Sequence, residues 1–332
     1  MLTPIYSISF QESEYGKSYD ITASHWTTSL GSKLCIVHVD TRPLNQTKEL
    51  FSPTFSWSEL EGESPGLLNH YLYAAIHGYR YHSIHANTYP LDSTTNEPER
   101  DNAWKRVPAL ASVLTNGLPP QDNGELSKDS TSPPTNERCE VVVLLDADAI
   151  FEHLELPFEW LMNRWNVTQH TSIAMPLSTQ WNTTDPNFMR PLDFTHNSKG
   201  DLNPNDGFIV ALNLPRTMQI LDAWNNCPDD NDRFPGCMRF KKGWLAELGA
   251  FGEYMPYTFD RDNEEGTDLR ILPCTEANGF KGQNTDCEGI FVRHFTTAKH
   301  RVKDGVAESI ARPLMAMMQS FMMDGNVRIK DD

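Results

Sequence analysis

The feature that most constrains this chain is a short apolar run that ends in two carboxylates, CEVVVLLDADAIF at residues 139–151. Residues 141–145 are all apolar, which is typical of a strand buried within a sheet. Asp146 and Asp148 follow directly. Because side chains two residues apart in extended chain point to the same side, we expect the two carboxylates to converge while Ala147 faces away. Two carboxylates that close repel each other unless a cation or a proton lies between them.

A divalent metal site is the first interpretation of this pair. In open α/β sheets, ligands bind outside the carboxyl ends of the strands, which is where the pair falls. Hard oxygen ligands suit Mg²⁺ or Mn²⁺, and such an ion would bridge a diphosphate.

Two other interpretations of the pair stay open. The aspartates could cap the following segment. They could also belong to a phosphatase of the haloacid-dehalogenase type, which carries D-x-D after a strand and uses the first Asp as nucleophile. That motif has Thr or Val where this chain has Ile150 and lies near the start of the chain, whereas here the pair lies mid-chain.

Strand-like and helix-like segments alternate along the sequence. This pattern predicts an α/β fold with a mostly parallel, Rossmann-like sheet and helices on both faces. The helix at 64–78 has clear ends, with Ser64 as N-cap, Pro65 in the first turn and Gly78 as the stop. We expect further helices at 102–117, 214–226 and 243–255, and strands at 33–40, 79–86, 139–145, 171–177, 206–213, 269–273 and 289–295.

The two ends and one internal segment stand apart from this pattern. We expect an N-terminal extension at 1–32, the α/β domain at 33–305, and a C-terminal helix and tail at 306–332. Residues 117–136 are polar and rich in proline, which predicts a surface insertion or disordered loop. The Met-rich stretch 308–323 predicts an amphipathic helix whose methionines pack in the core.

Charge and hydropathy exclude some classes of partner. The net charge is −17, so the average field repels nucleic acid and acidic membrane surfaces. No run approaches the roughly 18 consecutive apolar residues of a membrane span. The N-terminal stretch lacks the basic and apolar regions of a signal peptide. An acidic enzyme with a phosphorylated substrate needs a local cation, which again favours a divalent metal.

The six cysteines fit no C-x2-C zinc spacing. The pairs Cys227/Cys237 and Cys274/Cys287 each bracket a polar loop and suit short disulfides, whereas Cys35 and Cys139 are expected to be buried thiols. Three N-x-S/T sequons point to an oxidising secretory lumen, at Asn45, Asn166 and Asn182.

Six motifs occur in a fixed order along the chain: YAAIHGYRYHSIH at 73–85, WKRVPAL at 104–110, VVLLDADAIF at 142–151, NDGFIVALN at 205–213, WLAELGAFGEY at 244–254 and VRHF at 292–295. In this order the chain, from about Lys33 to His294, resembles a fungal-type member of glycosyltransferase family 34. That family contains retaining α-galactosyl-, α-mannosyl- and xyloglucan α-xylosyltransferases.

The resemblance implies a GT-A fold and a donor-binding metal site. The donor would be a UDP- or GDP-sugar carrying galactose, mannose or xylose, and the acceptor an oligosaccharide, polysaccharide or glycoprotein glycan. Mn²⁺, or Mg²⁺, would be held by Asp146, Asp148 and His294 and would act as a Lewis acid on the diphosphate leaving group.

Further residues are expected to bind the nucleotide sugar beside Asp146. Arg106, in the place of the family's Lys, and Lys299 would neutralise phosphate. Asp40, at the end of the first strand, is placed to meet the nucleotide.

The reacting sugar carbon becomes oxocarbenium-like, so a carboxylate or amide near its face helps the reaction. Glu247, Asn205 and Asp206 are the candidates for this catalytic role. The alternative for Glu247 is a solvated helix face, and the alternative for the other two is a tight turn, NPNDG, before a strand. A turn at the start of a strand can still present its side chains to the cleft, so the catalytic role and the turn are compatible for Asn205 and Asp206.

A second hypothesis is a degenerate GT-A-like protein that binds glycans or serves as a scaffold subunit of a transferase complex. Leu248 stands where the family usually has Gln, and Thr297 stands where it has Gly. Family members are typically Golgi enzymes with an N-terminal signal anchor. We find no such pattern in this sequence, so we expect either a trimmed or incomplete product or a member that differs. The compartment and the oligomeric state, homo- or hetero-oligomer, stay open.

Overall fold

The structure is a computed structural model that describes residues 24–118, 138–179, 196–259 and 268–322, apart from residues 92, 94, 95, 97, 244, 283 and 284. Most of the expected insertion at 117–136 and the sequon residue Asn182 lie outside the described residues.

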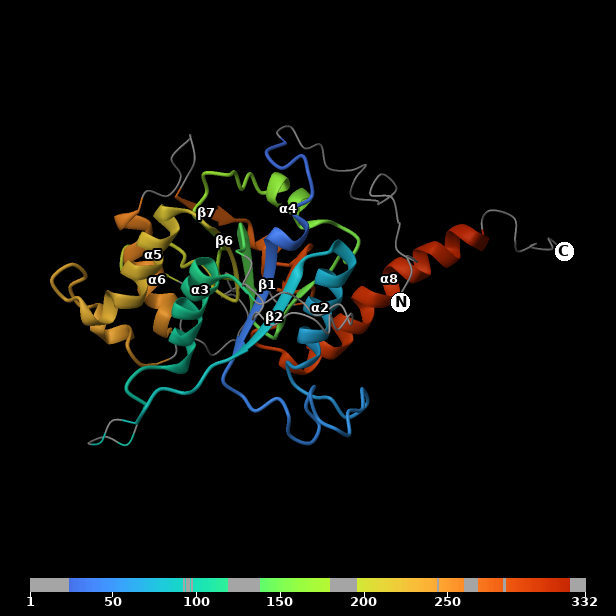
Figure 1. Ribbon diagram of the computed structural model, residues 1–332, viewed down its shortest axis with the longest axis horizontal. Coiled ribbons are helices and arrows are strands. Elements are labelled where there is room, and N and C mark those ends of the chain that lie inside the picture. Colours follow the sequence, from blue (N-terminus) through green and yellow to red (C-terminus); the bar gives the residue numbers. More distant parts are fainter. Residues whose placement is uncertain are drawn as a thin grey trace, which may run out of the picture.

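A six-stranded sheet forms the centre of the molecule (Figure 1). Its strand order is β2-β1-β3-β6-β5-β7. Five of these six strands run in the same direction. The sixth, β6, runs antiparallel to both of its neighbours, β3 and β5. The strands are β1 (Leu34–Asp40), β2 (Arg80–His85), β3 (Val141–Leu145), β5 (Ile173–Pro176), β6 (Phe208–Leu212) and β7 (Leu269–Leu272).

Helices cover both faces of this sheet because the strands are apolar on both sides. On β3, for example, Val142 packs with one buried cluster and Val143 with the other. One face carries α3 (Arg106–Asn116), α5 (Pro215–Asn226) and α6 (Ala246–Thr258); the other carries α2 (Pro65–His77) and α4 (Phe158–Arg164). This arrangement confirms the expected α/β class, with a mostly parallel, Rossmann-like sheet and helices on both faces.

Two short strands form a separate antiparallel pair, β4 (Ala149–Phe151) and β8 (Val292–His294). The long helix α8 (Val302–Phe321) packs against this pair and against α2. Short helical turns complete the described chain: α7 (Cys274–Ala277), η2 (Gly31–Lys33), η3 (Asn102–Lys105), η5 (Cys227–Asp229), η6 (Cys237–Phe240) and η7 (Lys299–Arg301).

All six cysteines are paired. The two expected short disulfides are confirmed, Cys227–Cys237 and Cys274–Cys287. The expectation of buried thiols at Cys35 and Cys139 is wrong, because these residues form a third disulfide with a Cα–Cα distance of 5.9 Å. They are 104 residues apart in sequence, and only the pairing of β1 with β3 brings them together.

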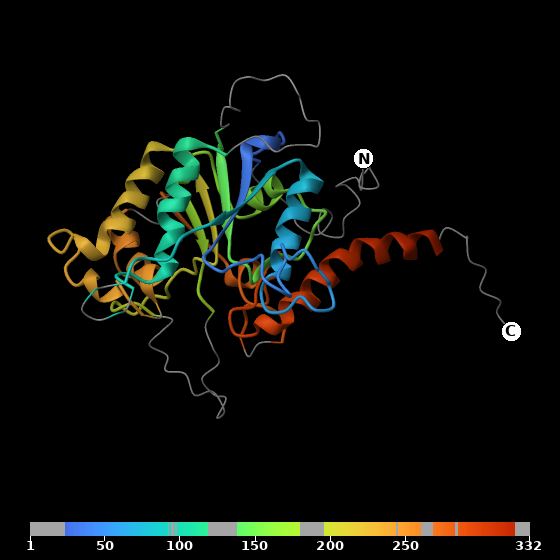
Figure 2. The same cartoon turned by 60° about the horizontal axis from the view of Figure 1, so that its bottom comes forward.

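Through Phe321 the Met-rich stretch is helical, as expected, but its described methionines do not pack in the core. Among the described residues, the buried ones of α8 all lie in its first half, up to Ser309. The second half extends away from the body of the molecule (Figures 1 and 2). Its exposed apolar residues are Ile310, Leu314, Met315, Met317, Met318 and Phe321, followed by Met322. Within the described residues, no helix is both long and apolar enough to cross a membrane.

Candidate metal and diphosphate site

The two aspartates lie in a tight turn between β3 and β4. The backbone N–H of Ala149 donates to the carbonyl of Asp146 at 3.0 Å, so the D-x-D segment is a turn and not the extended chain that the sequence suggested. The side chains nevertheless converge. Asp148 is buried and Asp146 is 27% exposed, so the pair opens to solvent on one side.

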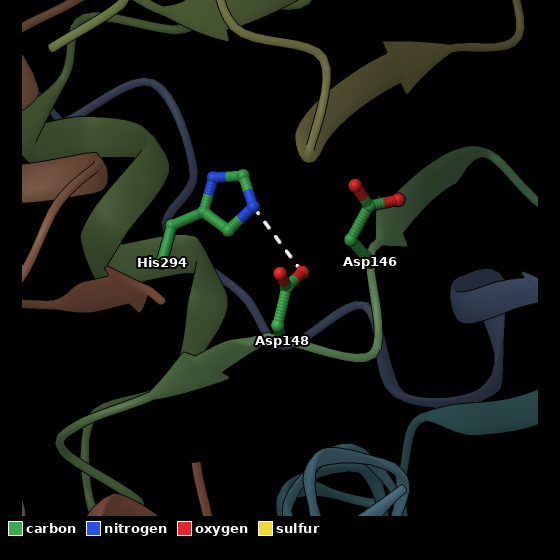
Figure 3. Close-up of side chains that lie close together, drawn as sticks. All are labelled: Asp146, Asp148 and His294. Carbon is green, nitrogen blue, oxygen red and sulfur yellow. Dashed lines mark ion pairs between the residues drawn. The ribbon is translucent and has the colours of Figure 1, made fainter. Parts of the chain in front are cut away.

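His294 joins the aspartates because β8 pairs with β4. In this pairing Ala149 lies opposite His294, and the N–H of Phe295 donates to the carbonyl of Asp148 at 2.9 Å. The Nε2 atom of His294 lies 3.3 Å from Oδ1 of Asp148 (Figure 3). One ligand atom from each of Asp146, Asp148 and His294 lies within 4.8 Å of the others. Two carboxylate oxygens and one imidazole nitrogen at this spacing can hold a divalent ion such as Mn²⁺ or Mg²⁺.

Two glycines make room for this group. A Cβ atom on Gly207 would lie 2.2 Å from Cε1 of His294 and 2.7 Å from its Nε2. A Cβ on Gly66, in the first turn of α2, would lie 1.9 Å from the carbonyl oxygen of Ala147. Both positions therefore require glycine for close approach and not for a special backbone conformation.

Two buried histidines hold the backbone on either side of the aspartates. A ring nitrogen of His38, Nδ1, lies 3.0 Å from the carbonyl oxygen of Leu145. The Nε2 atom of His70 lies 2.6 Å from the carbonyl oxygen of Ala149. Because carbonyls only accept hydrogen bonds, both ring nitrogens carry the donating proton. Sequence reasoning missed both residues, because a single histidine in an apolar strand or helix carries no motif.

Arg106 lies among three carboxylates. Its guanidinium is 3.0 Å from Asp146 Oδ1, 3.3 Å from Asp206 Oδ1 and 3.2 Å from Glu247 Oε1. Arg106 also donates to the backbone carbonyl of Asp206 at 3.1 Å. It thus links a candidate metal ligand to two of the three candidate catalytic residues. The phosphate contact expected of Arg106 stays a prediction.

The titration behaviour of the acidic residues follows from burial and from these cations. Burial and the neighbouring Asp206 raise the pKa of Glu247 well above its usual range. Burial raises the pKa of Asp146, although Arg106 opposes this effect. Asp148 is buried as well, but His294 and Lys299 lower its pKa to about 2. Burial would lower the pKa of His294, yet the Asp148 carboxylate raises it above its usual value.

A second chain of charges runs along the other side of the site. Asp40 accepts hydrogen bonds from Arg42, and Nε2 of His38 lies 3.2 Å from its carboxylate. Asp40 is buried, but these two neighbours hold its pKa well below its usual range. Arg42 reaches Glu63 at 3.1 Å, and Glu63 reaches the Nζ atom of Lys299 at 2.5 Å. The Nζ atom of Lys299 in turn lies 3.8 Å from Asp148, so this row of charged side chains runs from Asp40 to the candidate metal group.

Asn205 and Asp206 form the turn that the sequence suggested. The side-chain oxygen of Asn205 accepts from the N–H of Gly207 at 3.0 Å. Both residues also line the cleft. The turn therefore forms and its side chains still face the cleft, so the two interpretations are compatible. Glu247 is only 3% exposed, so the alternative of a solvated helix face is wrong for this residue.

All of the predicted site residues line one cleft of about 510 Å³ at the carboxyl ends of the parallel strands. Its wall brings together residues that are far apart in sequence: Asp40, Arg106, Asp146, Asp148, Asn205, Asp206, Glu247, His294 and Lys299. The three departures from the family pattern, Arg106, Leu248 and Thr297, line the same cleft. The volume suits a ligand of small-molecule size.

No protein-family model and no curated protein sequence matches this chain. Among solved structures, the chain is similar to that of "a glycosyltransferase involved in the glycosylation of the major capsid of PBCV-1". The superposition covers 82% of this chain and 98% of the other, with 10% sequence identity and a TM-score of 0.46. This likeness is too distant to assign an activity, so the case for a function depends on the side chains of the cleft.

Proposed function

We propose that this protein is a metal-dependent, retaining glycosyltransferase that moves galactose, mannose or xylose from a UDP- or GDP-sugar to a glycan acceptor. The observation that carries the proposal is the convergence of Asp146, Asp148 and His294 in one cleft at the carboxyl ends of the strands. The resemblance of six sequence motifs to glycosyltransferase family 34 supports the same activity.

In this proposal the three side chains hold Mn²⁺ or Mg²⁺, which when bound supplies Lewis-acid stabilisation of the diphosphate leaving group. Arg106 and Lys299 are assigned to neutralise phosphate, because Arg106 lies 3.0 Å from Asp146 and Lys299 lies 3.8 Å from Asp148. Arg42, which is joined to Lys299 through Glu63, is assigned to the same role. Asp40 is assigned to the nucleotide, at the end of β1.

The sugar is assigned to the side of the cleft that holds Asn205, Asp206 and Glu247. Arg106 fixes both carboxylates there, so the developing positive charge of the sugar carbon would meet preorganised oxygens. Burial and the neighbouring Asp206 raise the pKa of Glu247, so this carboxyl group holds a proton more readily than an exposed glutamate does.

The test is hydrolysis and transfer from a panel of UDP- and GDP-sugars, with Mn²⁺ and with chelator. We expect turnover of at least one donor that depends on Mn²⁺ and falls at least about 100-fold in Asp146→Ala and His294→Ala. Asp222→Ala, which removes an exposed aspartate on α5, is the matched control and should keep wild-type turnover. Equal turnover with chelator, or in Asp146→Ala, would contradict the assignment.

A second candidate is a GT-A-like protein that binds glycans or assembles with a transferase without catalysing transfer itself. Leu248 and Thr297 favour it, because both place bulkier or less polar groups in the cleft than the family pattern has. Calorimetry separates the two: the enzyme should bind UDP or GDP more tightly with Mn²⁺, whereas the degenerate protein should show no such gain. Release of phosphate from small phosphomonoesters would instead favour the phosphatase alternative.

We further propose that the chain matures in an oxidising compartment such as the Golgi lumen. All six cysteines are paired, and disulfides persist mainly in oxidising compartments. The sequon residues Asn45 and Asn166 are exposed, as N-glycosylation requires. A shift in mass upon enzymatic deglycosylation of the secreted protein tests this part of the proposal.

A further inference from the structure

Asn278 is a buried residue that contacts the imidazole of His294 from outside the cleft. It follows α7 directly and is 1% exposed. Its side chain makes three hydrogen bonds: Nδ2 donates to the carbonyl of Leu177 at 2.9 Å, Oδ1 accepts from the N–H of Gly279 at 2.8 Å, and Oδ1 lies 3.1 Å from Nδ1 of His294. No motif in the sequence marks this residue.

The first two bonds fix the orientation of the amide. A carbonyl such as that of Leu177 can only accept, so it must face the NH₂ group of Asn278, and the N–H of Gly279 can only donate, so it must face the oxygen. The same oxygen therefore faces His294 Nδ1 and can only accept there. Hence Nδ1 must carry a proton. Nε2 faces the Asp148 carboxylate, so in the metal-free site it can carry a second proton, and a cation bound there would take the place of that proton and accept the Nε2 lone pair.

We propose that Asn278 is a positioning residue that selects the Nδ1–H tautomer of His294 and so presents the Nε2 lone pair to a divalent cation. The inference rests on the proposed function only for the presence of the metal. Nε2 is the nitrogen that faces Asp148 at 3.3 Å, so the tautomer chosen by Asn278 is the one that a metal between these residues needs. Partners outside the ligand sphere act in this way in many metalloproteins.

The surrounding chain holds Asn278 and His294 in register. The N–H of His294 donates to the carbonyl of Gly279 at 2.8 Å. The Cys274–Cys287 disulfide closes the loop that contains Asn278. Gly207 lies directly against the imidazole, where a Cβ would come within 2.9 Å of Cε1, Nε2 and Nδ1. The ring is thus held through its backbone, its Nδ1 atom and its face.

The experiment compares Mn²⁺ binding by the full chain and its variants, measured by calorimetry and by electron paramagnetic resonance of free Mn²⁺. We expect Asn278→Ala to weaken Mn²⁺ binding about 10- to 100-fold. Asn278→Asp keeps an oxygen facing Nδ1 but sets a second acceptor against the Leu177 carbonyl, so it should lose stability yet weaken Mn²⁺ binding less than Asn278→Ala does. A wild-type Mn²⁺ affinity in folded Asn278→Ala would overturn the inference, as would equal losses in both variants.

The matched control is Asn213→Ala. Its Nδ2 donates to two backbone carbonyls, those of Leu114 and Cys139, at 2.8 and 3.0 Å, so the backbone fixes this amide too, but it lies at the other end of the sheet. We expect this variant to lose stability without losing Mn²⁺ affinity. A parallel loss of Mn²⁺ affinity in Asn213→Ala would mean that Asn278 acts only through stability, and would overturn the inference.

A second measurement needs neither metal nor activity, and it stands even where Asn278→Ala does not fold. The ¹⁵N shifts of the His294 ring in the metal-free wild type, above the pKa of the ring, distinguish the two tautomers. The Nδ1–H form is expected, and the Nε2–H form would overturn the inference. If that tautomer and Mn²⁺ binding are found but no sugar is transferred, the proposed function fails while the role of Asn278 stands.

Discussion

At the scale of single residues, the candidate metal group depends on the missing side chain of Gly207 as well as on its three candidate ligands. His294 can approach Asp148 only because position 207 has no side chain. The glycine of the NDG sequence thus serves two purposes: it belongs to the predicted turn, and it leaves room for the imidazole of His294.

We predict that Gly207→Ala displaces the ring of His294. Because the new Cβ would lie 2.2 Å from Cε1, the ring or the β6 backbone must shift. Overpacking of this kind costs about 1–3 kcal/mol of the free energy of unfolding. We also expect a fall of about tenfold or more in Mn²⁺ affinity. Urea denaturation and an Mn²⁺ titration measure the two effects.

Gly252→Ala is the control for overpacking alone. Its Cβ would lie 2.0 Å from Oδ1 of Asn203, outside the metal group. It should destabilise the fold and leave Mn²⁺ affinity unchanged. An unchanged Mn²⁺ affinity in Gly207→Ala would show that His294 is not a ligand.

A second residue-scale prediction concerns Asp40, whose pKa is held far below its usual range despite burial. A carboxyl group with a lowered folded-state pKa stabilises the fold above its unfolded pKa, about 3.9, and this stabilisation is lost as the pH falls through the folded-state value. Asp40→Asn should therefore cost about 2 kcal/mol at pH 7. The gap to the wild type should narrow as the pH drops below about 4. Urea denaturation at pH 7 and pH 3 measures this gap, and a gap independent of pH would contradict the prediction.

The sequence could locate the aspartates, the histidine strand and the turn residues, because each is attached to a local pattern. It could not locate His38, His70 or Asn278. Each of these contacts the site through a backbone carbonyl or a ring nitrogen on another element, and this contact exists only after the chain has folded.

At the scale of elements, the segment between β1 and α2 contributes Thr41, Arg42 and Glu63 to the lining of the cleft. Glu63, just before α2, joins Arg42 to Lys299, and Lys299 follows β8 in the chain. In the proposed function both cations serve a diphosphate, so the Glu63 carboxylate competes with that ligand for them.

We therefore predict that Glu63→Gln binds UDP or GDP more tightly in the presence of Mn²⁺. Lys299 is 53% exposed, so the competing ion pair is worth no more than about 1 kcal/mol, which corresponds to a gain of about three- to fivefold in affinity. Calorimetry measures the gain. Glu61→Gln is the matched control, since Glu61 pairs only loosely with Lys48 at 3.8 Å, and it should leave the affinity unchanged. Weaker nucleotide binding in Glu63→Gln would mean that Glu63 contacts the ligand directly.

The elements themselves were largely predictable, because apolar runs and helix ends are local signals. The reversed direction of β6 was not, since the pattern of a buried strand is the same in both directions. The Cys35–Cys139 disulfide was missed for a related reason. Each cysteine precedes or begins an apolar strand, and the sequence does not say that those two strands are neighbours.

At the scale of the whole molecule, α8 divides into a half that belongs to the domain and a half that extends from it (Figure 2). The first half contributes Val302 and Val306 to a cluster with Ile150 and Phe295. Arg312 then pairs with the buried carboxylate of Glu152, and beyond it every large apolar side chain of the described helix is exposed. Periodicity predicted the helix, but it could not say which half meets the core, because methionine suits both settings.

The last prediction is that deletion of every residue after Pro313 leaves the domain intact. The deletion removes no buried residue of the described helix, so the unfolding midpoint should change by less than about 2 °C, and Mn²⁺ affinity should stay the same. Arg312→Ala in the full chain is the contrasting variant. It leaves the buried Glu152 with Arg293 as its remaining partner at 2.8 Å and should lower the midpoint by about 4 °C or more. Differential scanning calorimetry measures both. A large fall in the truncated chain would show that the exposed half of α8 is covered in solution, and sedimentation at increasing concentration would then tell whether a second copy covers it.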